Sequence, residues 1–319
     1  MMIQTDFRSN NGTEKPMKSS RTAEYALLVL LATIWSSSFL MIKIALITVT
    51  PVTLAAGRML LASIVLLAIL FLQGQRLPQT GKVWGQCVFV GLFSNALPFF
   101  LIAWGEQYIN SGNAAIMMAI MPVLVPTLAH FFIAEEQLTP HKFLGIALGF
   151  TGLLVLVGFE ALAGLSQQVT GLLAVLLGTI CYSTTTIFVR RYVKQTGIVM
   201  SAGSILVGTI LLLLAAFVVE QPSQLRPSLQ AFAAIGILGV FATALATLLY
   251  FRLIRSVGAT VFSQINYLIP VLGVYWGSLV LHERPGWNAL LALLLIICGV
   301  ALVSRPQKSP RMAADVSSE

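Results

Sequence analysis

Ten long apolar stretches, separated by short polar connections, constrain this chain more than any other feature. We place them at 24–46, 51–72, 83–104, 112–134, 140–159, 170–190, 199–219, 229–251, 259–281 and 286–304. About 20 apolar residues in a helix span the hydrocarbon core of a bilayer. The stretches are continuously apolar rather than alternating, so we expect helices rather than barrel strands. Only 9% of the residues are charged, against roughly 25% in soluble domains. The sequence therefore predicts an all-α membrane protein with ten transmembrane helices.

The basic residues orient these ten stretches in the lipid bilayer. With the N-terminus in the cytoplasm, fifteen of the 19 Lys and Arg residues fall in cytoplasmic segments, and the outer connections hold only Arg226 and Arg284. Cytoplasmic connections of membrane proteins are enriched in these residues. We therefore predict a multi-pass protein of the cell inner membrane, with cytoplasmic tails at 1–23 and 305–319. The net charge of +8 then reflects topology, and we expect no nucleic-acid partner.

The chain also repeats itself. Pro122-Val123-Leu124 recurs 148 residues later as Pro270-Val271-Leu272, and each proline is followed thirteen residues later by an acid, Glu135 or Glu283. A repeat of this kind indicates two copies of one structural unit. The copies cover 24–159 and 170–304, and each holds five stretches. Because five is odd, the halves must insert in opposite directions, which predicts two inverted five-helix repeats.

Several short motifs within these repeats resemble a known family. They are WSSSF at 35–39, AAGR at 55–58, Pro122 with Glu135-Glu136, YFRLI at 250–254, GAT at 258–260, YLIP at 267–270 and LHER at 281–284. Over residues 24–304 the chain resembles EamA-type members of the drug/metabolite transporter superfamily. The resemblance implies ten helices, alternating access and export of small metabolites such as amino acids. One departure is Ser36, where a glycine commonly follows the tryptophan, so we transfer no ligand contact to that position.

No catalytic or metal-binding motif accompanies these spans. The sequence has no His-Glu-x-x-His zinc motif, no phosphate-binding glycine loop and no nucleophile elbow. The three histidines lie at helix ends without a cluster of cysteines or carboxylates. We therefore predict a protein that is not an enzyme and has no cofactor or bound metal.

Two cations lie within the predicted spans and are the charged candidates for substrate binding. Arg58 lies about seven residues into its span, which is roughly 10 Å deep at 1.5 Å per residue. Its partner could be Glu106 or the carboxylate of a substrate. Lys43 lies near the outer boundary, where its long stem can carry the ammonium group to water. No acid lies near the middle of a span, which argues against proton exchange at a buried carboxylate, as in small multidrug exporters.

Polar and aromatic residues on shared helix faces are the uncharged candidates for lining a substrate cavity. They are Ser36, Asn95, Phe99, Asn113, Met117, Tyr182, Thr186, Tyr250, Gln264 and Tyr267. The alternative for each is helix–helix packing, which also uses small hydroxyls, methionines and aromatic rings. Pro122 and Pro270 are predicted to break and bend gating helices.

Three functions are compatible with the sequence. The favoured one is a carrier that exports a small metabolite such as an amino acid by alternating access. A nucleotide-sugar or sugar-phosphate exchanger would need several inward-facing Lys and Arg residues. A membrane sensor or scaffold would need a soluble domain or long loop, and the chain offers neither. The substrate, the transport direction, the coupling ion and the oligomeric state, with a monomer among the options, stay open.

Overall fold

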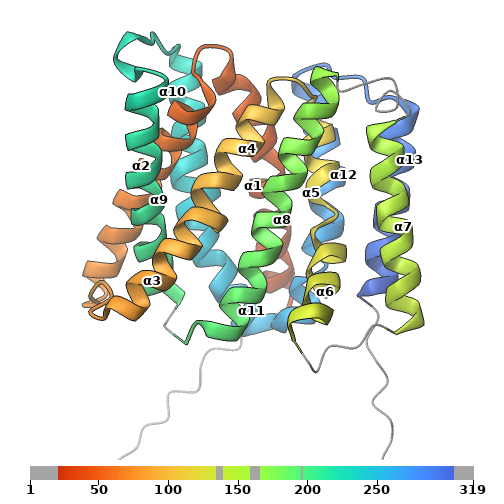
Figure 1. The fold of residues 1–319 in the computed structure, drawn as a ribbon, viewed down its shortest axis with the longest axis horizontal. Helices are drawn as coiled ribbons and strands as arrows, with labels where there is room; N and C mark the ends of the chain where they lie inside the picture. Colours follow the sequence, from red (N-terminus) through yellow and green to blue (C-terminus); the bar gives the residue numbers. More distant parts are fainter. Residues whose placement is uncertain (1–20, 134–138, 159–165, 195–196, 305–319) are drawn as a thin grey trace, which may run out of the picture.

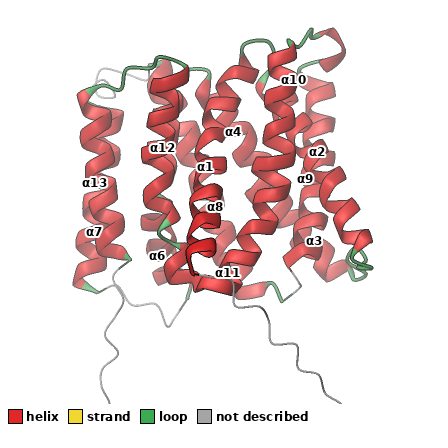
Figure 2. Ribbon diagram, turned by 180° about the vertical axis from the view of Figure 1, so that it is seen from behind, coloured by secondary structure: helices red, strands yellow, loops and turns green. Residues whose placement is uncertain are grey.

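The computed structural model of the chain describes residues 21–133, 139–158, 166–194 and 197–304, and these residues form a bundle of helices (Figure 1). The described residues contain no strand (Figure 2). In chain order the elements are α1 (Arg21–Leu46), α2 (Pro51–Leu72), α3 (Gly81–Val90), the π-helical segment η1 (Gly91–Ala96), α4 (Leu97–Glu106), α5 (Ser111–Met118), α6 (Met121–Phe132), α7 (Pro140–Val157), α8 (Gln167–Tyr192), α9 (Gly197–Val219), the 3₁₀ turn η3 (Pro222–Gln224), α10 (Leu229–Gly236), the π-helical segment η4 (Ile237–Leu245), α11 (Ala246–Phe262), α12 (Ile265–Val280) and α13 (Trp287–Val303).

Eight helical stretches are long and apolar enough to cross a membrane. Three of them join shorter elements end to end: α3 with η1 and α4, α5 with α6, and α10 with η4 and most of α11. The apolar helices α12 and α13 are shorter, at 16 and 17 residues. The prediction of an all-helical membrane protein is therefore confirmed, whereas the count of ten spanning helices stays a prediction.

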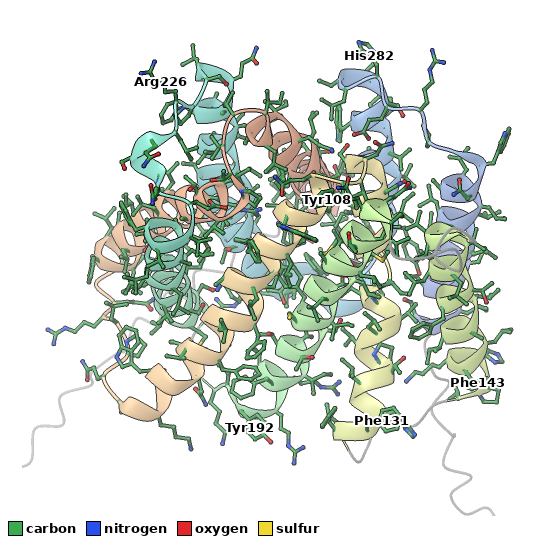
Figure 3. All side chains as sticks on the ribbon, turned by 45° about the horizontal axis from the view of Figure 1, so that its top comes forward. Tyr108, Phe131, Phe143, Tyr192, Arg226 and His282 are labelled. Atoms are coloured by element: carbon green, nitrogen blue, oxygen red, sulfur yellow. The ribbon has the colours of Figure 1, made fainter. Side chains whose placement is uncertain are left out.

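The connections between the helices gather at the two ends of the bundle. Arg226 and His282 lie at one end, and Phe131 and Tyr192 lie at the opposite end (Figure 3). The predicted topology assigns the first end to the outside, so we call it the outer end and the opposite one the inner end.

Helix starts at both ends follow ordinary capping chemistry. Thr139, Ser166 and Ser228 each accept a hydrogen bond from a backbone N–H three residues further on, at the starts of α7, α8 and α10. Proline occupies the first turn of α2 and α7, where its missing N–H costs nothing. These local signals position the connections and leave the helix faces to the packing.

Contacts between the two halves of the chain hold the bundle together. The most extensive ones join α7 to α13, α2 to α9, α1 to α12 and α4 to α8. Helices α7 and α13 lie side by side at one edge of the bundle (Figures 1 and 2). The face between α2, α4 and α9 is apolar, with Met59, Phe99 and Ile205 buried in one cluster. Each half is thus packed mainly against the other.

The two π-helical segments start 146 residues apart, which is the spacing of the sequence repeat. Each contains a glycine at which the facing helix comes very close. A Cβ at Gly91 would lie 2.7 Å from the carbonyl oxygen of Ser204 in α9, and one at Gly239 would lie 2.8 Å from that of Arg58 in α2. Ser204 follows Arg58 by 146 residues, so these two crossings are equivalent in the two halves. π-Helical segments often mark functional sites.

Candidate functional site

Arg58 is buried at one of these crossings. It lies on α2 with 8% of its surface exposed. Its Nε donates a hydrogen bond of 2.8 Å to Oγ1 of Thr243 in η4, and its guanidinium carbon lies 3.8 Å from the centre of the Phe99 ring. The Thr243 hydroxyl donates in turn to the carbonyl of Leu238, five residues earlier. The π-helical segment therefore helps to position the arginine, and the aromatic face stabilises its charge.

The equivalent crossing in the other half carries a neutral contact. Asn95 of η1 lies opposite Ser204 of α9, with 3.5 Å from its Nδ2 to the serine Oγ. Asn95 precedes Thr243 by 148 residues, as Arg58 precedes Ser204 by 146. Both crossings therefore bring polar side chains together in the interior. In one half the contact includes a full positive charge.

The expected partner of Arg58, Glu106, does not hydrogen-bond to it. Among the described residues, the only hydrogen bond made by the Arg58 guanidinium is the one from Nε to Thr243. Its two terminal nitrogens are left as donors. Such a pair matches the two oxygens of a carboxylate or phosphate.

Lys43 does not extend to water as we expected. Its Nζ donates to the backbone carbonyl of Glu106 at the end of α4. The last carbonyls of a helix have no partner within the helix, so this one is free to accept the ammonium. The stem therefore turns into the protein instead of snorkelling outward.

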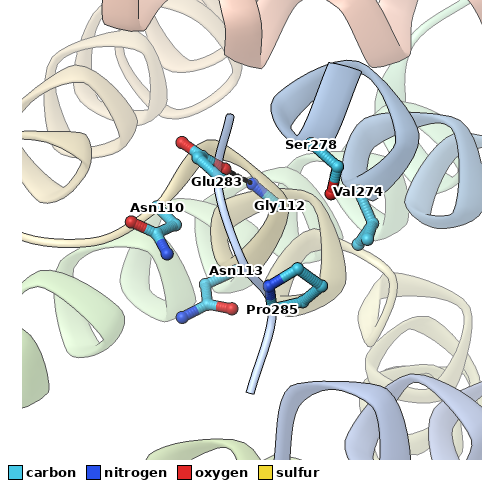
Figure 4. A pocket seen from close by; sticks show the side chains of 7 residues that line it. All are labelled: Asn110, Gly112, Asn113, Val274, Ser278, Glu283 and Pro285. Carbon is cyan, nitrogen blue, oxygen red and sulfur yellow. Dashed lines mark hydrogen bonds between the residues drawn. The ribbon is translucent and has the colours of Figure 1, made fainter. Parts of the chain in front are cut away.

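Several of the uncharged candidates are packing residues. Ser36 is fully buried, and its hydroxyl accepts a hydrogen bond of 3.2 Å from Trp276 Nε1 on α12. Met117 is fully buried in the largest apolar cluster. Asn113 lies beside Glu283 at a very small hollow near the outer end (Figure 4). These contacts join helices and leave no room for a substrate.

The aromatic candidates lie between clusters of the bundle. Tyr182 is partly buried against two apolar clusters and lies within electrostatic reach of Arg58. Tyr250 packs its ring against Trp35 and Phe262. Tyr182 is thus the aromatic candidate that, after Phe99, the structure brings closest to the arginine site.

The remaining polar candidates are not gathered around Arg58. Thr186 is exposed and donates to the carbonyl of Tyr182 on its own helix. Gln264 is exposed and Tyr267 is half-buried. Whether any of them contacts a substrate stays a prediction.

The two prolines behave differently. The break between α5 and α6 falls at Ala119–Ile120, immediately before Met121 and Pro122. In the second half the corresponding break lies at Ser263–Gln264, where the Gln264 N–H donates to the Val261 carbonyl, three residues earlier. Pro270 lies within α12, which continues past it. A break at Pro270 was therefore wrong, because the chain already interrupts the helix six residues earlier.

Two carboxylates of the second half cap helices of the first half at the outer end. Glu283 accepts from the N–H of Ser111 and of Gly112 at the start of α5 (Figure 4), which confirms that it anchors a helix. Glu220 accepts from the N–H of Val52 and of Thr53 at the start of α2. Glu220 was missed, because nothing in its local sequence says which helix start it meets.

A cavity of about 670 Å³ lies at the inner end, between the end of α2, the start of α9 and α11. Arg252 and Arg255 line it together with Gln73 and Gln75. Among its described lining residues is none of those predicted to bind substrate. The sequence shows both arginines as topology signals, but not that they share a cavity.

A bundle of apolar helices with buried polar contacts between two equivalent halves defines a polytopic membrane protein. A sequence model described as the EamA-like transporter family matches the chain twice, over residues 22–158 and 169–305. The chain belongs to the EamA-like transporter family and is a membrane transporter of that type.

Similar proteins carry transporter names without a substrate. The "Uncharacterized inner membrane transporter YedA" of Escherichia coli (strain K12) is 28% identical over 88% of this chain and 90% of its own length. The "Uncharacterized transporter YoaV" of Bacillus subtilis is 25% identical over 84% of this chain and 91% of its own. "Protein PagO" of Salmonella typhimurium is 28% identical over 92% and 97%.

A solved crystal structure is similar in fold. It superposes with a TM-score of 0.64 at 22% identity, covering 89% of this chain and 98% of the other. The arrangement of the bundle is therefore shared with a protein of known structure.

Proposed function

We propose that this transporter exports small metabolites, and amino acids in particular, by alternating access across the cell inner membrane. In this proposal ten helices form two inverted five-helix repeats at 24–159 and 170–304, with cytoplasmic tails at 1–23 and 305–319. The equivalent crossings at Gly91 and Gly239 support the inverted repeat, because each half presents its π-helical segment to the other half.

The difference between the two ends of the bundle carries the proposal. At the outer end, the carboxylates of Glu220 and Glu283 tie the second half to the first. At the inner end, the cavity beside α11 separates parts of the same two halves. A protein closed at one end and open at the other has the form of one end state of an alternating-access cycle.

The site around Arg58 supports an anionic group on the substrate. Its terminal nitrogens are available as donors, and the Phe99 ring and Thr243 hydroxyl hold the guanidinium in place. A buried cation with free donors attracts a carboxylate, which amino acids carry. Tyr182 and Phe99 add aromatic surface for the rest of the substrate.

The test is counterflow of labelled amino acids in proteoliposomes, with Arg58→Ala compared with wild type. The control is Arg226→Ala, because Arg226 is an exposed arginine in the connection at the outer end. We expect transport to fall at least about tenfold in Arg58→Ala, which corresponds to the loss of roughly 1.4 kcal/mol of binding, and to stay unchanged in the control. Unchanged transport in a folded Arg58→Ala protein would remove the arginine from the site.

One observation favours the second candidate, a nucleotide-sugar or sugar-phosphate exchanger. The inner cavity carries two arginines, Arg252 and Arg255, and phosphates bind such pairs well. The same liposomes loaded with a nucleotide sugar decide between the two. Exchange that is lost in Arg252→Gln but kept in Arg58→Ala would support the exchanger over the amino-acid carrier.

A further inference from the structure

Glu106 ends α4 and is fully buried, with 0% of its surface exposed. Neither of its carboxylate oxygens has a hydrogen-bond partner among the described residues. A buried carboxylate without a partner is costly, and proteins keep such groups mainly for function. This carboxylate therefore needs a partner that the described part of the polypeptide does not supply.

The charged neighbours of Glu106 are engaged elsewhere. The nearest are Lys43, Glu283 and Arg58, which lie within electrostatic reach. The Lys43 ammonium binds the backbone carbonyl of Glu106, not its carboxylate. The Arg58 guanidinium binds Thr243, and Glu283 caps α5. The cations nearby therefore make a site that suits an anion, without pairing with it.

Glu106 and the arginine site share one face of α4. Phe99, on which Arg58 stacks, precedes Glu106 by seven residues, or two helical turns. Their backbone positions are thus about 10 Å apart along the helix. Side chains on a helix tilt toward its N-terminus, which directs Glu106 back toward Phe99 and the guanidinium. An unpaired anion and a cation with free donors therefore face one stretch of helix surface.

We propose that Glu106 binds the ammonium group of a zwitterionic substrate whose carboxylate binds Arg58. The inference rests on the proposed transport of amino acids and narrows it to α-amino acids, as against amines or carboxylic acids. An amino acid spans about 2.5 Å from its nitrogen to its carboxyl carbon, and a charge-assisted hydrogen bond of about 2.8 Å at each end extends this to roughly 8 Å. That reach matches the separation along α4.

Because Glu106 is closed off from solvent, the substrate reaches it only when the outer end opens. The caps made by Glu220 and Glu283 lie at that end. In the present conformation the ammonium site is therefore shielded. Pairing with Glu106 belongs to the outward-facing part of the cycle.

Three probes with one phenyl group separate the charges: phenylalanine, phenethylamine and 3-phenylpropionate. We would measure their transport in proteoliposomes for wild type, Glu106→Gln and the control Glu283→Gln, whose carboxylate caps a helix. Wild type should prefer phenylalanine to 3-phenylpropionate at least tenfold. Glu106→Gln should lose that preference. Glu283→Gln should keep the preference even if it is less stable.

Folding is followed separately by thermal unfolding in detergent. Glu106→Gln removes an unpaired buried charge, so we expect it to melt at or above the wild-type temperature. An unchanged preference in Glu106→Gln, or equal transport of phenylalanine and 3-phenylpropionate by wild type, would overturn the proposal. If none of the probes moves but another metabolite does, the zwitterion site fails and the transporter stands. If no metabolite moves, both proposals fall.

Discussion

The hydroxyl of Thr243 offers the sharpest test of how the arginine site is built. It accepts from Arg58 Nε at 2.8 Å and donates to the Leu238 carbonyl at 2.8 Å. Thr243→Val keeps the shape and removes both bonds. A hydrogen bond to a charged group contributes about 1.5–3 kcal/mol and a neutral one about 1, while the added methyl returns about 0.8. The expected loss is about 2–3 kcal/mol of unfolding free energy.

The assay is reversible unfolding by SDS in mixed micelles, followed by tryptophan fluorescence. A loss of this size lowers the folding equilibrium constant about 30- to 140-fold, at 1.4 kcal/mol per tenfold. Thr243→Ser retains the hydroxyl and should lose less than about 1 kcal/mol. Thr247→Val is the matched control, because the Thr247 hydroxyl donates to a carbonyl of its own helix. Equal stability of the Val and Ser variants at 243 would refute the argument.

Three further substitutions test the packing by the same assay. Glu220→Ala uncaps α2 and should cost about 0.5–2 kcal/mol; wild-type stability would mean that water replaces the carboxylate. Gly239→Ala places a Cβ 2.8 Å from a carbonyl oxygen of α2, whereas a Cβ at Gly236 has no neighbour within 4 Å. The first should cost about 1–3 kcal/mol and Gly236→Ala should not destabilise; equal effects would contradict the close crossing. Ser36→Ala removes the acceptor of Trp276 and should cost about 0.5–1.5 kcal/mol, and an unchanged midpoint would show that the bond contributes nothing.

Hydropathy and charge predict the helical membrane fold well, because every spanning segment must satisfy its own backbone hydrogen bonds. The same logic located Arg58, since a cation in a span is conspicuous. It could not locate the partner of Arg58. Thr243 lies 185 residues away, and a threonine in an apolar helix looks the same whether it packs or accepts a hydrogen bond.

Local irregularities were hidden for a similar reason. The π-helical segments η1 and η4 are made of small and apolar residues that also suit a regular helix. Pro270 was expected to break its helix, but the interruption lies at Ser263–Gln264, where no residue announces it. Glu106 was visible as an acid at a helix end, whereas its complete burial depends on how α1, α2 and α4 meet.

The unequal crossings have a consequence for how such a protein divides its time between its two end states. In a carrier made of identical halves, exchanging the conformations of the halves gives a state of equal energy. Here one crossing holds Arg58 with Thr243 and its equivalent holds Ser204 with Asn95. The exchange therefore moves a charged contact into the place of a neutral one, and the degeneracy is lifted. The resting population is biased toward one side of the membrane by chemistry at a single pair of equivalent positions.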